Sequence, residues 1–224
     1  MAPFEACLLD AYDTIIRTDY FPFRDELPAL AGVPAEAMWK QFRELGPALS
    51  VGQLTMTEAF TKVLRACGAD PRPDLIRQLT DRSRELLLSA TRLYDDVLPF
   101  LRWARARGLR TAIVSNCDEN TVGVLDTLGV TALVEAEALS FRVGVAKPAP
   151  KIYFEALGHL GVPAGSALFV DNSAVYCAGA DDVGIHAAQM VRGAEPAGGA
   201  GQSGSAFPVV RSLADVQALI DAET

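Results

Sequence analysis

An alternation of short apolar runs with helical segments is the feature that most constrains this fold, and it occupies the chain from Tyr94 onward. An isolated apolar run at residues 4–10 precedes it, has no helical periodicity and ends in a polar residue, which is typical of a buried strand. Strands that alternate with helices form a parallel sheet with right-handed crossovers. The sequence therefore predicts an α/β fold, a Rossmann-like parallel sheet with helices on both faces.

The expected strands are residues 4–10, 110–115, 133–135, 167–170, 186–191 and 207–211. The expected helices beside them are residues 96–107, 120–128, 148–160, 174–183 and 213–220. Residues 193–205 are rich in Gly, Ala and Ser, and we expect them to form a flexible surface loop.

Residues 15–92 carry helical signals and no strand signals. Breakers such as Gly32-Val33-Pro34 separate four helical segments, at residues 24–31, 35–45, 57–67 and 73–89. This pattern predicts an all-helical insertion at residues 15–92, within an α/β core made of residues 1–14 and 93–224.

Composition excludes several classes of protein. The formal net charge of −8 argues against a nucleic-acid surface, which needs a basic stripe. No apolar stretch approaches the roughly 20 residues that span a bilayer, and residues 1–5 lack the basic region of a signal peptide. We therefore expect a cytoplasmic protein without a membrane or nucleic-acid partner. Its four cysteines are far apart and should be reduced, and Cys117 is interpreted as small buried filler rather than a nucleophile.

Four polar sites end an apolar run or open a helix: Asp10, Ser115-Asn116, Lys147-Pro148 and Asp171-Asn172. The carboxyl ends of parallel strands share one edge, where open α/β sheets bind ligands, so these sites should converge. Their order resembles the haloacid dehalogenase-like hydrolase superfamily, whose members carry a nucleophilic Asp, then a Ser or Thr, then a Lys often in K-P-x-P, then an acidic pair. The resemblance covers nearly the whole chain. It implies that the inserted helices form a mobile cap that closes over the active site and selects the substrate.

The residue types at the first three sites predict their chemical roles. Asp10 is the candidate nucleophile, because a carboxylate held close to phosphorus or carbon forms a covalent ester that water later cleaves. Ser115 and Asn116 supply a hydroxyl and nearby backbone amides that can bind a phosphoryl or carboxylate oxygen. Lys147 precedes a proline, which favours extended backbone and aims the ammonium outward, where it can neutralise the nucleophile and the substrate anion. We expect Asp10, Ser115 and Lys147 to be catalytic, and Ser115, Asn116 and Lys147 to bind substrate.

Tyr12 departs from the phosphatases of this family, which place a second Asp two residues after the nucleophile as general acid and base. Tyr has an ordinary pKa of about 10 and is a poor base at neutral pH. The string Asp10-Ala11-Tyr12 looks instead like the D-A-Y-G-T loop of the 2-haloacid dehalogenases. Asp13 is interpreted as a turn residue rather than a substitute acid or base, and Thr14 as a brace for the loop.

Asp171 and Asn172 bear on the choice between phosphatase and dehalogenase chemistry. Mg²⁺ prefers hard oxygen ligands, and the expected set is Asp10, the Tyr12 backbone carbonyl, Asp171 and Asn172. The dehalogenases use no metal and have a Ser-Ser-Asn-like string here, with an Asp a few residues later. This chain has Asp171-Asn172-Ser173 and Tyr176 instead.

The cap arginine that grips the departing halide in dehalogenases is also not matched, because Trp39-Lys40 lies near its place and Arg43 one turn later. Tyr153 matches a dehalogenase aromatic residue or simply packs its helix. The first hypothesis is a Mg²⁺-dependent phosphatase that forms an aspartyl-phosphate on Asp10 from a small phosphomonoester. The alternatives are a metal-free 2-haloacid dehalogenase and a binding or regulatory protein that lost turnover. The substrate is expected to be a small molecule, and the oligomeric state stays open.

Overall fold

Parallel strands form the central sheet of the computed structural model, which describes residues 4–193 and 206–222. The strands are β1 (Ala6–Leu9), β4 (Arg110–Ser115), β5 (Ala136–Leu139), β6 (Ala167–Asp171), β7 (His186–Met190) and β8 (Val209–Val210). In space they follow the order β5-β4-β1-β6-β7-β8, and every neighbouring pair is parallel. The predicted α/β class is confirmed, and the first strand of the chain lies inside the sheet.

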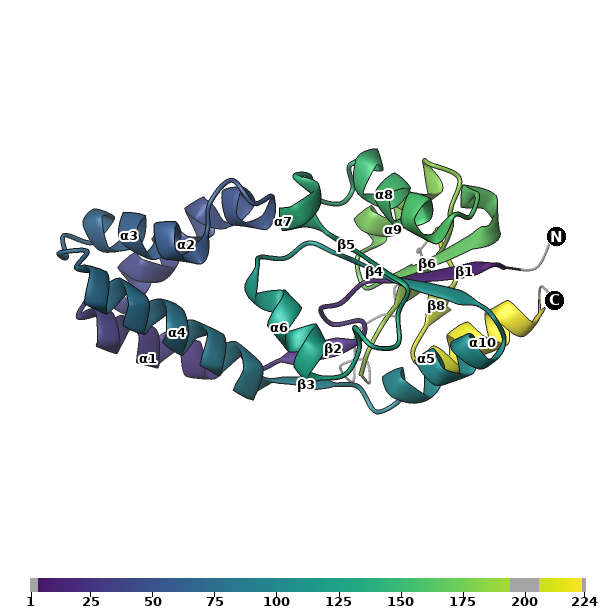
Figure 1. The fold of residues 1–224 in the computed structure, drawn as a ribbon, viewed down its shortest axis with the longest axis horizontal. Coiled ribbons are helices and arrows are strands. Elements are labelled where there is room, and N and C mark those ends of the chain that lie inside the picture. The colour runs from purple at the N-terminus through teal and green to yellow at the C-terminus, as the bar shows by residue number, and fades with distance from the viewer. Residues whose placement is uncertain (1–3, 194–205, 223–224) are drawn as a thin grey trace.

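Helices cover both faces of this sheet (Figure 1). Those on one face are α5 (Val97–Ala106) and α10 (Leu213–Ala222), and those on the other are α8 (Pro150–Leu160) and α9 (Ala174–Asp181). Side chains of β1 alternate between the two layers: Cys7 and Leu9 pack with α5 and α10, whereas Ala6 and Leu8 pack with α8. A strand buried on both faces is apolar throughout, so the first polar side chain, Asp10, stands where the strand ends.

The remaining core elements differ from the prediction in two places. The strand predicted at residues 133–135 lies instead at Ala136–Leu139. Before it the chain makes an extra turn, in which the Leu133 and Val134 amides donate to the Val130 carbonyl, so pairing with β4 begins only at Ala136. The short helix α7 (Ser140–Val143) was not predicted, whereas α6 (Asn120–Thr127) lies where expected. The loop predicted at residues 193–205 lies, from residue 194 on, outside the described residues.

Four helices inserted between β1 and β4 form the cap: α1 (Phe21–Ala31), α2 (Ala35–Ser50), α3 (Met56–Ala66) and α4 (Pro73–Ala90). Their apolar faces share a core of their own, in which Leu27, Met38 and Phe60 are at most 2% exposed. The start of α3 is fixed by a capping box, in which the Thr55 hydroxyl accepts from the Glu58 amide and the Glu58 carboxylate accepts from the Thr55 amide. The cap therefore packs around its own core.

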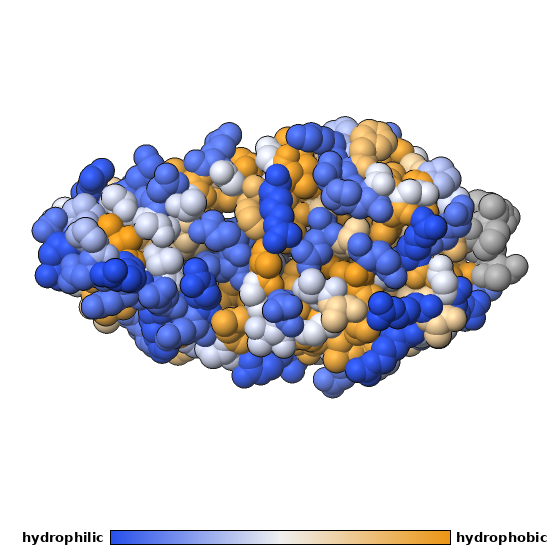
Figure 2. Space-filling view, in the orientation of Figure 1, coloured by the Kyte–Doolittle hydropathy of each residue, from blue (hydrophilic) through white to orange (hydrophobic). Residues whose placement is uncertain are grey.

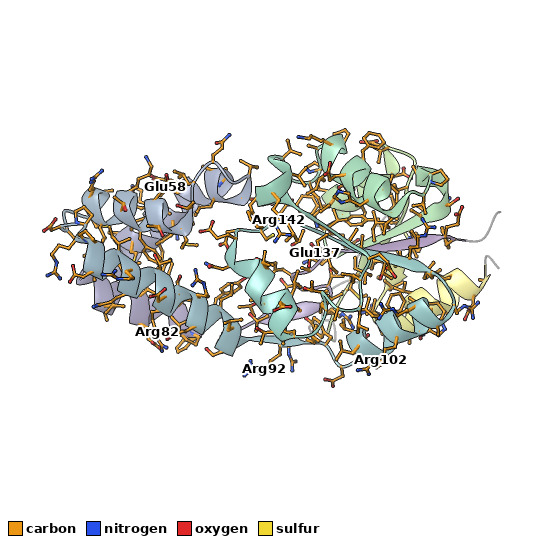
Figure 3. All side chains as sticks on the ribbon, viewed as in Figure 1. Glu58, Arg82, Arg92, Arg102, Glu137 and Arg142 are labelled. Carbon is orange, nitrogen blue, oxygen red and sulfur yellow. The ribbon has the colours of Figure 1, made fainter. Side chains whose placement is uncertain are left out.

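Charged residues cover the outside of the cap. Arg82 of α4 donates to Glu26 of α1 at 2.5 Å and to Glu85 at 3.0 Å, at the lower edge of the cap in Figure 3. Figure 2 shows hydrophilic residues over most of the visible face of the cap, and hydrophobic residues more widely over the core. Across residues 4–193 and 206–222, every helix is too short or too polar to cross a membrane.

Two short antiparallel strands carry the chain into and out of the cap. These are β2 (Ile16–Thr18) and β3 (Thr91–Leu93). The hydroxyls of Thr18 and Thr91 are hydrogen-bonded at 2.9 Å, which links β2 and β3 where the chain passes between core and cap. These strands at the ends of residues 15–92 were not predicted, because three residues are too few to show an alternating pattern.

Candidate active site

Three neighbouring strands bring the polar sites to one edge of the sheet. Ser115 ends β4, Asp10 follows β1 and Asp171 ends β6, and these strands are adjacent in the order β4-β1-β6. The register pairs Leu9 of β1 with Ile113 of β4 and Val170 of β6, so the three strands end at nearly the same level. This carboxyl edge faces the cap (Figure 1).

Lys147 joins the two carboxylates of this edge. Its ammonium lies 2.5 Å from Asp10 Oδ1 and 2.6 Å from Asp171 Oδ2. The three residues are buried, with Asp10 6%, Lys147 3% and Asp171 0% exposed. The ammonium also lies over the rings of Phe169 and Tyr176, at 5.4 Å and 5.1 Å from their centroids. The predicted meeting of Asp10, Lys147 and Asp171 is therefore present, with Lys147 directed into the site.

This cluster holds one more negative than positive charge. Burial and the neighbouring Asp10 charge raise the pKa of Asp171 to about 6, although Lys147 opposes that rise. Burial alone would lower the pKa of Lys147, but Asp10 and Asp171 together raise it. The second oxygen of Asp171, Oδ1, accepts from the Ser173 amide at 2.7 Å. Lys147 is thus held as a cation, and the two carboxylates remain incompletely neutralised.

Asn116 and Ser115 have different parts in the site. The Asn116 side chain donates to the Lys147 carbonyl at 3.0 Å and accepts from the Lys147 amide at 2.7 Å. Its side chain, expected to contribute to substrate binding, therefore holds the backbone that carries Lys147. Ser115 is fully buried, and its hydroxyl has no hydrogen-bond partner within the described residues. Leaving a buried hydroxyl unpaired is costly, so Ser115 is suited to bond an oxygen that a ligand brings.

Tyr12, in the loop after Asp10, is not free to act as a general acid or base. The Tyr12 hydroxyl is hydrogen-bonded to the Thr121 hydroxyl at 2.9 Å, and burial raises the pKa of Tyr12 further above its ordinary value. Asp13 is exposed and has a left-handed φ of 59°, as expected for a turn residue. The carbonyl of Thr14 accepts from Arg192 at 2.8 Å and 3.0 Å, which braces the loop.

A cavity of about 400 Å³ adjoins the site between cap and core. Tyr12 and Asn116 line it from the core, and Trp39 and Phe60 line it from the cap. Cys117 lines it as well, but burial raises the pKa of its thiol to about 12. Because this thiol stays protonated at neutral pH, Cys117 is a packing residue rather than a nucleophile.

Comparison with known families shows the family to which this chain belongs. A sequence model described as haloacid dehalogenase-like hydrolase matches residues 4–184. The chain belongs to the haloacid dehalogenase-like hydrolases. The resemblance seen in the order of the motifs is thereby confirmed, and the protein is a hydrolase with the core and helical cap described above.

Relatives of this hydrolase include both dehalogenases and phosphatases. (S)-2-haloacid dehalogenase 1 of Pseudomonas sp. (strain CBS-3) is 29% identical over 204 residues, which cover 86% of each chain. Glyceraldehyde 3-phosphate phosphatase of Methanopyrus kandleri is 30% identical over 130 residues, 58% of this chain and 56% of that protein, so the match spans just over half of that relative. The crystal structure of 2-haloacid dehalogenase from Pseudomonas syringae pv. Tomato DC3000 has a TM-score of 0.71 at 22% identity, covering 99% of this chain and 100% of that one, which shows the shared fold.

The residues of this hydrolase that were compared with dehalogenases have structural explanations. Trp39 lines the cavity, whereas Lys40 and Arg43 are exposed, and none of the described residues that line the cavity is an arginine. Tyr153 is fully buried and its hydroxyl donates to the Tyr176 carbonyl at 2.7 Å. Tyr153 therefore packs and fastens α8 against α9, the plainer of the two interpretations.

The oxygen atoms at this edge fit a magnesium ion, which takes one or two carboxylates together with substrate and water. The carboxylates of Asp10 and Asp171 and the carbonyl of Tyr12 are the candidate donors, and the excess negative charge on the carboxylates is what a cation would neutralise. Within the described ranges no three His, Cys, Asp or Glu side chains group together as metal ligands, so the protein would offer two carboxylates. Asn172 is exposed and its backbone carbonyl accepts from Gln189 at 3.2 Å, so its part in a metal site stays a prediction.

Two features of the site were not predicted from the sequence. Asp118 and Asn120 line the cavity just after Ser115, and their place behind a strand end is a signal that could have found them. Ser140 accepts from the Cys117 amide at 2.9 Å and donates to the Ser50 carbonyl of the cap at 2.5 Å. No pattern in the sequence marks Ser140, because its importance comes from a contact between segments far apart in the chain.

Proposed function

We propose that this hydrolase cleaves a small phosphomonoester through an aspartyl-phosphate on Asp10, with Mg²⁺ as the cofactor. The observation that carries the proposal is the second buried carboxylate, Asp171, which lies 2.6 Å from the ammonium that also binds Asp10. A nucleophilic aspartate needs one neutralising cation, and Lys147 supplies it. The second carboxylate leaves one negative charge over in this cluster, which a divalent cation would offset.

Charge explains why that cation favours phosphate chemistry. Asp10, Asp171 and Lys147 together carry one negative charge, which repels any anionic substrate that approaches the nucleophile. A divalent cation held by Asp10 and Asp171 would reverse the sign of the charge on the site. When bound, Mg²⁺ supplies positive charge that offsets the charge of the phosphoryl oxygens.

The residues of the chain then have the following roles. A carboxylate oxygen of Asp10 forms a bond to phosphorus while the bond from phosphorus to the leaving oxygen breaks, and the electron pair departs with that oxygen. Lys147 holds Asp10 in place, and the unpaired hydroxyl of Ser115 donates to a phosphoryl oxygen. Water then attacks the phosphorus of the aspartyl-phosphate, which releases inorganic phosphate and restores Asp10.

Tyr12 limits the rate of this reaction, because it does not serve as a general acid or base. The leaving oxygen must take its proton from water, because the Tyr12 hydroxyl is bonded to Thr121 and its pKa is raised by burial. Esters of acidic alcohols such as phenols, which leave without help, should react much faster than esters of alkyl alcohols. Hydrolysis of the aspartyl-phosphate should be slow for the same reason, since general acid and base catalysis is worth about 10²–10⁴-fold.

A metal-free 2-haloacid dehalogenase is the second candidate. The string Asp10-Ala11-Tyr12 favours it, as does the match of 86% of the chain to a haloacid dehalogenase. In that reaction Asp10 would attack the carbon that bears the halogen, and the halide would leave without needing a proton. The charge of Asp171 and the lack of an arginine among the described residues lining the cavity oppose it.

A paired assay on one protein preparation tests the two candidates. Purified protein is incubated with a panel of phosphomonoesters, with Mg²⁺ or with a chelator, and in parallel with 2-chloropropionate. Mg²⁺-dependent release of phosphate supports the proposal, and its loss in Asp10→Asn assigns the nucleophile. Halide release that persists in the chelator would establish the dehalogenase instead. Neither product from a folded protein would favour the binding or regulatory alternative.

A further inference from the structure

We propose that the substrate's leaving group is an apolar or aromatic body that carries an ammonium group, and that Asp118 binds that ammonium. This inference rests on the proposed phosphomonoester hydrolysis, because it assigns the part of the substrate that remains after phosphate is removed. The cavity of about 400 Å³ between cap and core is where that part would lie. Tyr12 and Asn116 connect the cavity to the loops that carry Asp10 and Ser115.

The charge of the cavity points to a cation. Fifteen described residues line it, and Asp118 alone among them is ionisable as an acid or base near neutral pH, since none is Lys, Arg, His or Glu and the Cys117 thiol stays protonated. The Asp118 carboxylate accepts from the Asn120 amide at 2.9 Å through Oδ1, a bond that also fixes the start of α6. Burial raises the pKa of Asp118, and no described residue of the cavity lining is a cation that would offset its charge. An ammonium group would supply that compensation.

Asn120 provides an independent sign of a missing donor. It is 5% exposed and lines the same cavity, and its side-chain oxygen has no hydrogen-bond partner among the residues described. Asp118 and Asn120, which both line the cavity, therefore carry acceptor oxygens, and an ammonium has three N–H donors to offer them. A purely apolar ligand would leave the Asp118 charge uncompensated and the Asn120 oxygen unpaired, which is costly, and an anionic ligand would be repelled by Asp118.

The walls of the cavity suit the rest of such a molecule. Six of the lining residues are aromatic: Tyr12, Tyr20, Phe23, Trp39, Phe42 and Phe60. Trp39 and Phe42 have ring centroids 5.5 Å apart, and Phe42 and Phe60 5.1 Å apart in an edge-to-face pair. Aromatic faces attract both apolar groups and cations, so they favour an amine on an aromatic body over a sugar or a dicarboxylate.

Three phenyl phosphates that differ only in the end of one chain test the inference. They are 4-(2-aminoethyl)phenyl phosphate, 4-propylphenyl phosphate and 3-(4-phosphonooxyphenyl)propanoate, which carry a cation, a neutral group and an anion. Wild type should have a kcat/KM for the cationic ester about tenfold or more above that for the neutral one, and lowest for the anionic one. In Asp118→Asn the ratio of cationic to neutral ester should fall to about one. Asn keeps the acceptor that fixes the start of α6, so the change removes the charge while the fold is retained.

Asp126→Asn is the matched control, because Asp126 is an exposed carboxylate on α6, the helix that follows Asp118, and the ratio should not change there. A wild type without preference for the cationic ester, or an Asp118→Asn variant that keeps it, would overturn the inference. A second readout separates this from failure of the proposed function. Binding of tyramine and of 4-propylphenol is measured by calorimetry on wild type and Asp118→Asn. If no ester is hydrolysed, the proposed function fails, yet Asp118-dependent binding of tyramine still supports the amine site and its absence refutes it.

Discussion

Replacing Asp171 by Asn should stabilise the protein at alkaline pH in the absence of metal. Asp171 is fully buried, and its pKa rises from an ordinary 3.8 to about 6 because of burial and of the Asp10 charge. That difference, at about 1.4 kcal/mol per pH unit, corresponds to about 3 kcal/mol of cost when Asp171 ionises in the folded protein. Asn resembles the neutral acid, so Asp171→Asn avoids this cost and should be more stable by up to about 3 kcal/mol at pH 8.

The pH dependence gives the sign of the effect. An acid with a higher pKa in the folded than in the unfolded chain holds its proton more tightly when folded. Its contribution to stability is therefore full below about pH 4 and is lost as the pH rises through about 6. The advantage of Asp171→Asn should thus be large at pH 8, smaller at pH 6 and absent near pH 4.

Urea unfolding of wild type, Asp171→Asn and the surface control Asp126→Asn, with a chelator present, measures this difference. Added Mg²⁺ should narrow the gap at pH 8, because an ion that binds wild type more tightly stabilises it more. A variant that is less stable than wild type at pH 8, or a difference that does not change with pH, would refute the reasoning. The first result would mean that the bond from Lys147 outweighs the charge repulsion between Asp10 and Asp171.

Three further substitutions test other parts of the site. Asp10→Asn should remove nearly all turnover without loss of thermal stability, and activity above a few per cent in a steady-state assay would show that another group attacks. Tyr12→Asp should speed release of phosphate from the aspartyl-phosphate, by at most about 10²–10⁴-fold, in single-turnover kinetics with Mg²⁺; an unchanged rate would show that proton transfer does not limit this step. Gly52→Ala should lower kcat/KM, because Gly52 has a φ of 70° and a Cβ there would collide with the Phe141 carbonyl oxygen where cap meets core; an unchanged kcat/KM would mean that this contact does not hold the cap over the site.

The sequence predicted the strands that carry the site because each is buried on both faces. Such a strand is a continuous apolar run, and the first polar residue after it marks the end of the strand, as at Asp10 and Asp171. Parallel pairing then requires these ends to lie at one edge. The fold and the meeting of the carboxylates with Lys147 follow from this local pattern together with the order of the motifs.

Contacts between distant segments could not be predicted in this way. The pairing of β2 with β3 depends on residues 16–18 meeting residues 91–93 across the whole cap. The two hydrogen bonds between the Asn116 side chain and the Lys147 backbone join two loops, and nothing in either loop alone indicates them. The shift of β5 to Ala136–Leu139 has a local cause, since an extra turn after Val130 uses amides that an alternating pattern would assign to the sheet.

Charge, rather than the residues of the first motif, separates the candidate chemistries of this site. Tyr12 stands where phosphatases of this family have a general acid and base; this favours a dehalogenase but is also compatible with a slow phosphatase. Asp171 adds a second negative charge beside Lys147, and Asp118 adds one in the adjoining cavity. Among the residues that the structure describes, Lys147 is the single ammonium in the cluster, and it is already bonded to both Asp10 and Asp171. Under the two proposals, the remaining positive charge arrives with what binds, as a metal ion at the strand ends and an ammonium group beneath the cap.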